Sequence, residues 1–205
     1  MEAGRICIGF GIPYVGLYSA NGGSPTYSSG RRLARGVSVS IQPETSDNNE
    51  FRADNVVAET QAGVFTGGTL TLTVDGLLQE SECLIYGIPE PEDYSYGESK
   101  KAKMLKYGDD ANIPYVGVGF IAEYMSGGVK TYVPVIIRKV QFSMSAISHS
   151  TEEKTYNWQK QELTATIMRD DSPNHDWKWM AEGQQTEAEA EEILKAVLNV
   201  TPEEP

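Results

Sequence analysis

Few residues in this 205-residue sequence have the types and spacing that catalysis or metal binding requires. His175 and Asp176 are adjacent, a pair that could hold a metal ion or exchange a proton, and Asp109-Asp110 could hold a cation. The other histidine, His149, shares no local motif with a cysteine or with a glycine-flanked serine. We therefore interpret His175 as a polar turn residue and Asp109-Asp110 as part of a solvated loop. The sequence predicts a protein that is not an enzyme, with no catalytic residue and no metal site.

Cofactor chemistry has equally little support. Gly9-Phe10-Gly11 is half of a dinucleotide-binding fingerprint, but the third glycine, the following helix and the later acidic residue are missing. No phosphate-binding loop is present in the sequence. The two cysteines, Cys7 and Cys83, lie far apart and match no metal-ligand spacing, so we expect two reduced thiols. The sequence predicts no cofactor.

Two tryptophans form the remaining chemical signal. Trp177 and Trp179 alternate with Asp176 and Lys178, an arrangement that could present a sugar-stacking face. Two indoles also bury a large apolar area when they pack in a core or a subunit interface. We favour packing in the core or in an interface over sugar binding.

The net charge of the chain argues against one further class of function, nucleic-acid binding. The formal net charge is −12, and residues 181–205 hold seven glutamates against one lysine. Nucleic-acid binding through phosphate neutralisation needs clustered lysine and arginine, so this balance argues against it. No signal-peptide pattern opens the sequence, and no apolar stretch nears the ~20 residues of a membrane helix. We expect a protein that is made in a cytoplasm, stays soluble and has no membrane partner.

Several segments alternate apolar and polar residues with the period of a half-buried strand. This alternation predicts strands at 36–42 (core side chains Val37, Val39 and Ile41), at 68–75 (Leu70, Leu72 and Val74) and at 162–168 (Leu163, Ala165 and Ile167). Further strands are expected at 51–60, with a break at Asp54-Asn55, and at 176–181. The segments 115–125 and 129–143 are expected to form a hairpin through Gly127-Gly128.

The middle of the second hairpin strand, Val133 to Ile137, is apolar on both faces and should be covered on both sides. Proline cannot donate a backbone hydrogen bond, so Pro134 indicates a sheet edge or a bulge.

Two helices are expected. One begins after a capping Asp75, runs for about ten residues and ends at Gly87. The other spans 186–198, where Thr186 and Glu189 form a capping box before an apolar stripe.

The remaining segments are less regular. Residues 1–35 are expected to be an arm with short first strands, including a Gly- and Ser-rich loop at 21–32, and 89–113 is expected to be a long loop. The pentapeptide Ile-Pro-Tyr-Val-Gly occurs at 12–16 and again at 113–117, as a doubled strand unit or by chance. The predicted organisation is thus an arm (1–35), a β domain (36–181) and an acidic helix with a tail (182–205).

One group of segments carries a family resemblance through its order and spacing. It comprises the strand at Val37–Ile41, Ala-Asp-Asn-Val-Val-Ala-Glu at 53–59, Gly-Gly-Thr-Leu-Thr-Leu-Thr-Val-Asp-Gly-Leu at 67–77, Pro-Tyr-Val-Gly-Val-Gly-Phe at 114–120, Lys-Val-Gln-Phe at 139–142 and Leu-Thr-Ala-Thr-Ile-Met at 163–168. Together they resemble the major tail protein (tail tube protein) family of siphophages and related prophages. The likeness covers 36–168 in pieces, and residues 1–35 and the helix at 186–198 depart from it.

The resemblance implies a mainly β fold, a β-sandwich or partial barrel of the phage tail tube type with one short flanking helix and a C-terminal helix. It implies a structural virion protein whose hexameric rings stack into a tube, through which DNA passes without specific binding. Its partners would be further copies of the chain, a tape-measure protein, and tail-tip and terminator proteins. The protein would reside in the virion tail, and in the host cytoplasm before assembly.

An acidic and polar lumen would repel phosphates, which is compatible with the net charge. The alternatives are another tail component, such as a tail terminator or a decoration protein, or a carbohydrate-binding β-sandwich module.

The sequence also suggests which residues would contact neighbouring subunits. The acidic first half and the lysine-rich second half of the 89–113 segment would pair across an interface, or the segment is a solvated loop. Pro134 and the two tryptophans complete the set. The candidate interface residues are Glu90, Glu92, Asp93, Lys100, Lys101, Lys103, Lys106, Pro134, Trp177 and Trp179.

Overall fold

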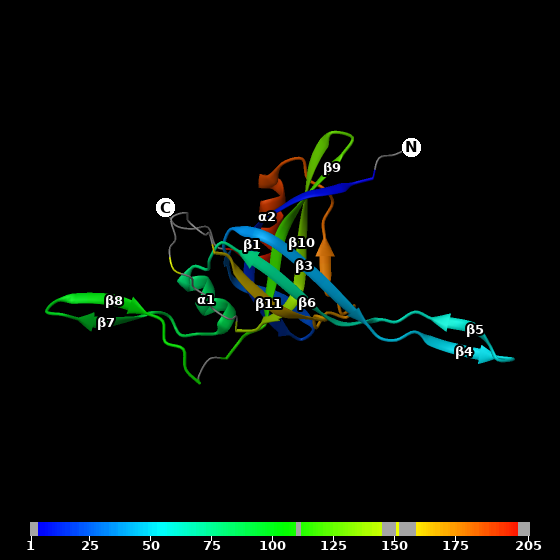
Figure 1. Ribbon diagram of the computed structural model, residues 1–205, viewed down its shortest axis with the longest axis horizontal. Helices are drawn as coiled ribbons and strands as arrows, with labels where there is room; N and C mark the ends of the chain where they lie inside the picture. Colours follow the sequence, from blue (N-terminus) through cyan, green and yellow to red (C-terminus); the bar gives the residue numbers. More distant parts are fainter. Residues whose placement is uncertain (1–3, 110–111, 145–150, 152–158, 201–205) are drawn as a thin grey trace.

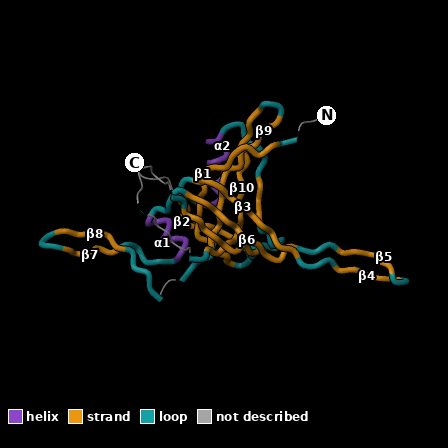
Figure 2. The backbone as a smooth tube through the Cα atoms, viewed as in Figure 1, coloured by secondary structure: helices purple, strands orange, loops and turns teal. Residues whose placement is uncertain are grey.

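The computed structural model describes residues 4–109, 112–144, 151 and 159–200, which form one large sheet, two helices and two separate hairpins (Figures 1 and 2). The helices are α1 (Gln79–Tyr86) and α2 (Glu187–Leu198). The strands are β1 (Ile6–Asn21), β2 (Ser24–Arg32), β3 (Gly36–Thr45), β4 (Asn49–Ala53), β5 (Val56–Gln61), β6 (Phe65–Val74), β7 (Glu92–Tyr96), β8 (Lys100–Met104), β9 (Val116–Ser126), β10 (Val129–Phe142), β11 (Gln161–Met168) and β12 (Lys178–Met180).

The large sheet is antiparallel and strongly curled. Its strand order is β2-β1-β9-β10-β11-β6-β3, and β12 also pairs with β10. The sheet curls until β3, at its far end, packs against β1. A Cβ placed on Gly36 of β3 would lie 2.4 Å from the ring of Phe10 in β1. The N–H of Leu33 also donates to the carbonyl of Pro13 at 2.8 Å. The fold is therefore mainly β and sandwich-like, as predicted.

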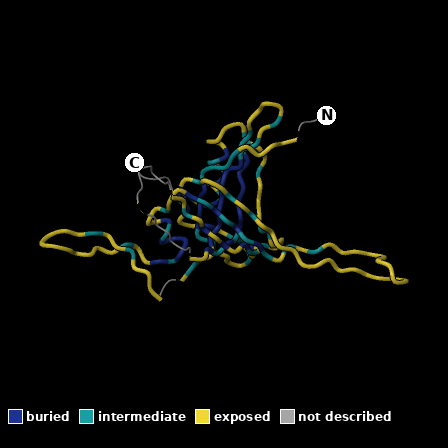
Figure 3. The backbone as a smooth tube through the Cα atoms, in the orientation of Figure 1, coloured by how far each residue is buried: buried dark blue, intermediate teal, exposed yellow. Residues whose placement is uncertain are grey.

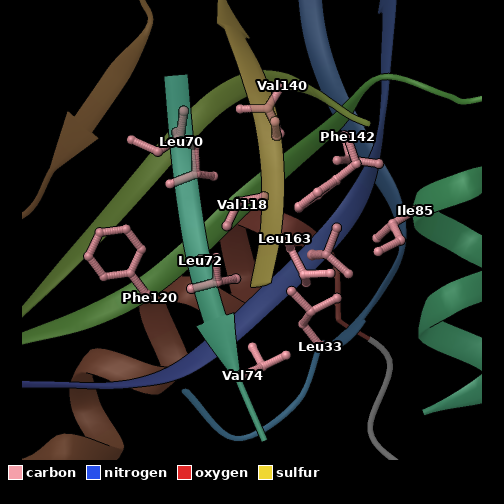
Figure 4. Close-up of a cluster of buried hydrophobic side chains, with 14 of the residues drawn as sticks. Leu33, Leu70, Leu72, Val74, Ile85, Val118, Phe120, Val140, Phe142 and Leu163 are labelled. Atoms are coloured by element: carbon pink, nitrogen blue, oxygen red, sulfur yellow. The ribbon is translucent and has the colours of Figure 1, made fainter. Parts of the chain in front are cut away.

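The inside of the curled sheet holds the main hydrophobic core, whose side chains converge from several strands with α1 beside them (Figure 4). The side chains predicted to face the core from β6 and β11 are all fully buried: Leu70, Leu72, Val74, Leu163, Ala165 and Ile167. In β3 the prediction holds for Val39 and Ile41, which pack against this core, but it is wrong for Val37. The pairing of β3 with β6 shifts between Gly36 and Ser38, so Val37 is the extra residue of a bulge and stays exposed.

A second, smaller core lies on the outer face of the sheet, under α2. It comprises Tyr14, Tyr27, Ile121, Ile136, Ala190, Leu194 and Leu198. The predicted capping box is present: the hydroxyl of Thr186 accepts from the N–H of Glu189 at 3.3 Å, and the Glu189 carboxylate accepts from the N–H of Thr186 at 3.2 Å. Because the two cores lie on opposite faces of β9 and β10, the run from Val133 to Ile137 is covered on both sides, as predicted.

Glycines let α2 approach the sheet. A Cβ on Gly30 would lie 2.3 Å from the carbonyl oxygen of Leu198, and one on Gly16 would lie 2.8 Å from the same atom. Gly16 lies directly opposite Gly117, so the two Ile-Pro-Tyr-Val-Gly copies meet across β1 and β9. A Cβ on Gly117 would lie 2.3 Å from the ring of Tyr27. Both copies of the pentapeptide thus place a glycine where the packing leaves no room for a side chain.

The N-terminal region differs most from expectation. β1 lies inside the sheet between β2 and β9, so it is not an arm. The residues after Gly22 and Gly23 form β2, which pairs with β1, where a Gly- and Ser-rich loop was predicted. Gly11 and Pro13 do not end β1, because its pairing with β9 shifts register between Gly11 and Tyr14. Bulges of this kind absorb residues that a regular ladder cannot pair.

Two segments expected to be a strand and a loop are hairpins. The 51–60 segment turns back at Asp54 and Asn55, whose φ values of 51° and 63° fit a two-residue turn, so β4 pairs with β5. The 89–113 segment contains the β7–β8 hairpin, which turns at Gly97 (φ 62°).

The element ends also differ in places. α1 is eight residues long, and Asp75 does not cap it, since its carboxylate accepts from the N–H and the guanidinium of Arg35. Gly87 ends the helix in the left-handed region (φ 62°), as predicted. The strand expected at 176–181 is shorter and comprises the three residues of β12.

Candidate assembly surfaces

Within the described residues, the side chains with catalytic or metal-binding potential do not form a cluster. His175 lies within the 170–176 turn with φ 54°, and its Nδ1 is 3.2 Å from the carbonyl oxygen of Asp170. Among the described residues no three His, Cys, Asp or Glu side chains are placed to hold a metal ion. His149 and Asp110 lie outside the described residues. No helix within the described part of the chain is long and apolar enough to cross a membrane.

The two tryptophans have different neighbours. Trp177 stacks on Phe65 with 4.6 Å between ring centroids and 8° between planes, and it packs against the main core. Trp179 lies under the guanidinium of Arg138, 3.5 Å from its ring centroid, and its indole N–H donates to Asp176 at 2.9 Å. Trp177 is thus a packing residue, as we favoured, whereas Trp179 keeps 40% of its surface exposed.

A buried ion pair fixes the 170–176 turn to β10. The Arg138 guanidinium contacts one carboxylate oxygen of Asp170 through Nε at 2.9 Å and Nη2 at 2.8 Å, with side chains 4% and 0% exposed. The other oxygen accepts from the N–H and the hydroxyl of Ser172. Burial alone would raise the pKa of Asp170, but the hydrogen bonds from Ser172 and Arg138 outweigh it and hold this pKa below its usual value. The pair therefore anchors the chain that leads to Trp177 and Trp179.

Pro134 is buried inside the subunit. It lies in β10 between β9 and the chain around β12, not at a sheet edge. The pairing slips by one residue between the Tyr132–Gln184 bridge and the Val135–Met180 pair, so Pro134 sits at a local irregularity. The bulge alternative fits this position, and the residue offers little surface to a neighbouring subunit.

The charged candidates lie on the β7–β8 hairpin and its base. Lys106 pairs with Glu92 at 2.5 Å, and Lys101 pairs with Asp93 at 3.5 Å. The hydrogen bond and charge of Lys106 lower the pKa of Glu92. The acidic and lysine-rich halves of the segment thus meet within one hairpin.

Glu90 and Lys103 lie at the root of this hairpin. They line a cavity of about 470 Å³ together with residues of β1, β2 and α1, among them Leu17, Arg31, Glu80 and Cys83. Burial, as the largest cause, raises the pKa of the Cys83 thiol.

The β7–β8 hairpin has one apolar and one charged face. Directly opposed residues of a strand pair share a face, and alternate residues follow on that face. Tyr94, Tyr96 and Met104 therefore lie together, with exposures of 53%, 49% and 45%. The ion pair between Asp93 and Lys101 lies on the opposite face, whereas Glu92, directly opposite Met104, belongs to the aromatic face and pairs there with Lys106. Nothing in the described part of this chain covers the aromatic face.

The β4–β5 hairpin repeats this arrangement. Phe51 and Val56 share one face and are 64% and 63% exposed. The other face carries an ion pair between Glu50 and Arg52, at 3.0 Å, together with Val57, which is 44% exposed. This hairpin was missed by the sequence analysis, although Asp54-Asn55 is a turn signal that could have revealed it.

The two hairpins project from opposite ends of the body along its longest axis (Figure 1). Nearly all of their residues are exposed (Figure 3). We name them the β4–β5 arm (Asn49–Gln61) and the β7–β8 arm (Glu92–Met104). The large sheet ends in β2 and β3; the edge of β2 is covered at Gly30, which bridges to Val200 and donates its N–H to the carbonyl of Asn199 at 3.2 Å. Where they stay uncovered, such edges present unpaired backbone groups that another chain can bind.

The sequence matches no known family model, and no curated protein matches it significantly. The features of the chain that bear on function are its two arms, its sheet edges and its charge. Exposed apolar faces and strand edges are typical of surfaces that contact other proteins.

Proposed function

We propose that the protein is a structural subunit that self-assembles, the major tail tube protein of a long-tailed phage. Copies associate into hexameric rings, and the rings stack into a tube through which DNA passes. Tape-measure, tail-tip and terminator proteins are the further partners of such a tube. The protein resides in the virion tail, after synthesis in the host cytoplasm.

The observation that carries this proposal is the pair of amphipathic arms. A two-stranded hairpin in water is marginally stable by itself, and each arm leaves its large apolar side chains uncovered. Exposed apolar surface of this kind marks a binding site for another protein. An assembly would cover both arms and would supply partners to the backbone groups of β2 and β3 that stay unpaired among the described residues.

The placement of the arms favours an open-ended assembly. They differ in sequence and lie at opposite ends of the molecule, so a contact between one arm and the other arm of a neighbouring copy is heterologous. Heterologous contacts repeat from copy to copy and generate rings or filaments, depending on the rotation between neighbours. The net charge of −12 also suits a conduit for DNA, because acidic walls repel phosphates.

The direct test is negative-stain electron microscopy of the purified protein over a concentration series, with light scattering to follow mass. We expect rings or tubes of uniform width, whose symmetry can be counted in end views. Closed caps or complexes that never extend would favour a terminator or decoration role instead. A monomer at every concentration, with and without a tail-tip complex as nucleus, would overturn the proposal.

A second experiment tests the function as a conduit. Assembled tubes are passed over immobilised duplex DNA at low salt, where phosphate contacts are strongest. We expect no retention. Tight, salt-sensitive binding would contradict a repelling lumen.

A further inference from the structure

We infer that the aromatic face of the β7–β8 arm in one copy docks on the apolar face of the β4–β5 arm in the next copy. This inference rests on the proposed function, since it requires that copies of the chain assemble. Beyond that function, it identifies the two surfaces through which neighbouring copies contact each other.

The two arms are built alike. Each arm has one face that gathers its largest exposed apolar side chains and an opposite face with an internal ion pair. Val57 shares the ion-paired face of the β4–β5 arm, and Glu92, paired with Lys106, lies at the base of the aromatic face of the β7–β8 arm. The apolar faces are centred on Phe51 and Val56 in one arm and on Tyr94 and Tyr96 in the other. Two such faces cover each other when they pack together, while both ion-paired faces stay in water.

The two apolar faces also carry opposite charges. Lys100 lies directly opposite Tyr96, on the aromatic face of the β7–β8 arm, and Glu59 lies directly opposite Phe51, on the apolar face of the β4–β5 arm. Both side chains are exposed, and within the described residues neither takes part in an ion pair. Each apolar face thus carries one ionic group of its own without a counter-charge, and the two groups have opposite signs. Such complementarity selects a partner and its orientation.

Copies with a net charge of −12 repel each other, so assembly is favoured where that repulsion is locally absent. The β7–β8 arm is neutral, with Glu92, Asp93 and Glu98 against Lys100, Lys101 and Lys103, whereas the β4–β5 arm contains Glu50, Asp54 and Glu59 against Arg52. The neutral arm, whose lysines all lie on β8, can therefore approach the acidic arm without net repulsion.

The geometry excludes closure within one copy. The arms point away from each other at opposite ends of the longest axis, so neither can reach the other in the same subunit (Figure 1). Each subunit gives one arm to each of two neighbours, and the contact then propagates along the assembly.

Two deletion variants test the pairing. In one, Asn49–Gln61 is replaced by a short Gly-Ser linker, and in the other Glu92–Met104 is replaced in the same way. Each variant keeps one arm, so a mixture can form one arm-to-arm junction and cannot extend it. We expect sedimentation velocity of the mixture to show a complex that joins one unit of each variant, where a unit is a monomer or a ring. We expect no such complex in either variant alone. A mixture that sediments as the sum of its parts would overturn the inference.

A charge exchange tests the register of the docked faces. We expect K100E and E59K each to weaken association of the full-length chain at least tenfold, and the double variant to regain most of the loss. K103E is the matched control, because Lys103 lies on the same strand but on the opposite face of the arm. If K103E weakens association as much as K100E, or if the double variant is weaker than both single variants, the face-to-face pairing is wrong.

The two proposals fail in different ways. Tubes from the wild-type chain without pairing of the deletion variants would keep the tail tube function and remove the arm-to-arm contact. Pairing of the deletion variants, with no ring or tube from the wild-type chain under any condition, would keep the contact and remove the tube.

Discussion

The buried ion pair between Arg138 and Asp170 allows a quantitative test of the fold. Replacing Asp170 with Asn keeps the shape of the side chain and removes its charge. The Arg138 guanidinium would then remain 4% exposed, over the ring of Trp179, with no counter-charge. Removing one partner of a buried pair leaves an uncompensated charge, which costs about 3–5 kcal/mol. For a chain of this size, such a loss lowers the melting temperature by on the order of 10 °C.

The control is the adjacent residue. Asp171 pairs with Lys139 at 2.7 Å, but its side chain is 48% exposed. Exposed pairs contribute about 0–1 kcal/mol, so D171N should change stability far less than D170N. Urea unfolding, followed by tryptophan fluorescence, measures both variants on the same chain. Equal losses for the two substitutions, or a loss below about 1 kcal/mol for D170N, would refute the assignment of a buried, paired charge.

The dependence on pH has a defined sign. The pKa of Asp170 is lowered in the folded state, so the unfolded chain binds its proton first as the pH falls. The contribution of the pair is complete above the unfolded pKa of about 3.9 and is lost as the pH falls through the folded value. The stability difference between wild type and D170N should therefore be constant near neutral pH and shrink below about pH 4. A difference that grows on acidification would contradict this sign.

Further substitutions test the packing of α2 and the state of the thiols. G30A should cost about 1–3 kcal/mol, because the new Cβ would lie 2.3 Å from a carbonyl oxygen at the end of α2, while G108A, with nothing within 4 Å, should stay within about 0.5 kcal/mol; urea midpoints compare them. T186A removes the helix cap and should cost about 1 kcal/mol in the same assay, and an unchanged midpoint would dismiss the capping box. A thiol reagent should label Cys7 in the native protein and Cys83 only after unfolding, since Cys7 is exposed and burial raises the pKa of Cys83; rapid native labelling of both would contradict the buried position.

The strands of the core were predictable because their pattern is local. Leu70, Leu72 and Val74 alternate with threonines, and that period of two places one set of side chains on the core face. The start of the C-terminal helix was equally predictable, since the side chains of Thr186 and Glu189 each accept from the other's backbone N–H within a single turn. Such signals need no knowledge of distant residues.

β1 was not predictable in the same way. Gly11 and Pro13 interrupt its pattern, and only pairing with β9 and β2 holds the chain extended through the bulges. The hairpins of the two arms were missed for other reasons. Residues 51–60 were predicted to be one strand with a break at Asp54-Asn55, whereas the chain turns back at that break. β7 and β8 are exposed on both faces in one copy, so no alternation between buried and exposed residues marks them as strands. Val37 was assigned to the core because the bulge that exposes it depends on its partner strand.

The candidate assembly surfaces were also predictable only in part. The lysines and acids of the 89–113 segment were identified from sequence, but only the hairpin register decides that Lys101 meets Asp93 and that Tyr94 and Tyr96 share a face. Sequence by itself determined the charge, the main core strands and the two helices, because composition and short-range periodicity are properties of the local chain. The tertiary structure decided the curl of the sheet, the burial of Arg138 with Asp170 and the opposite directions of the arms. These features depend on contacts between residues far apart in the chain, whose pairing no local pattern encodes.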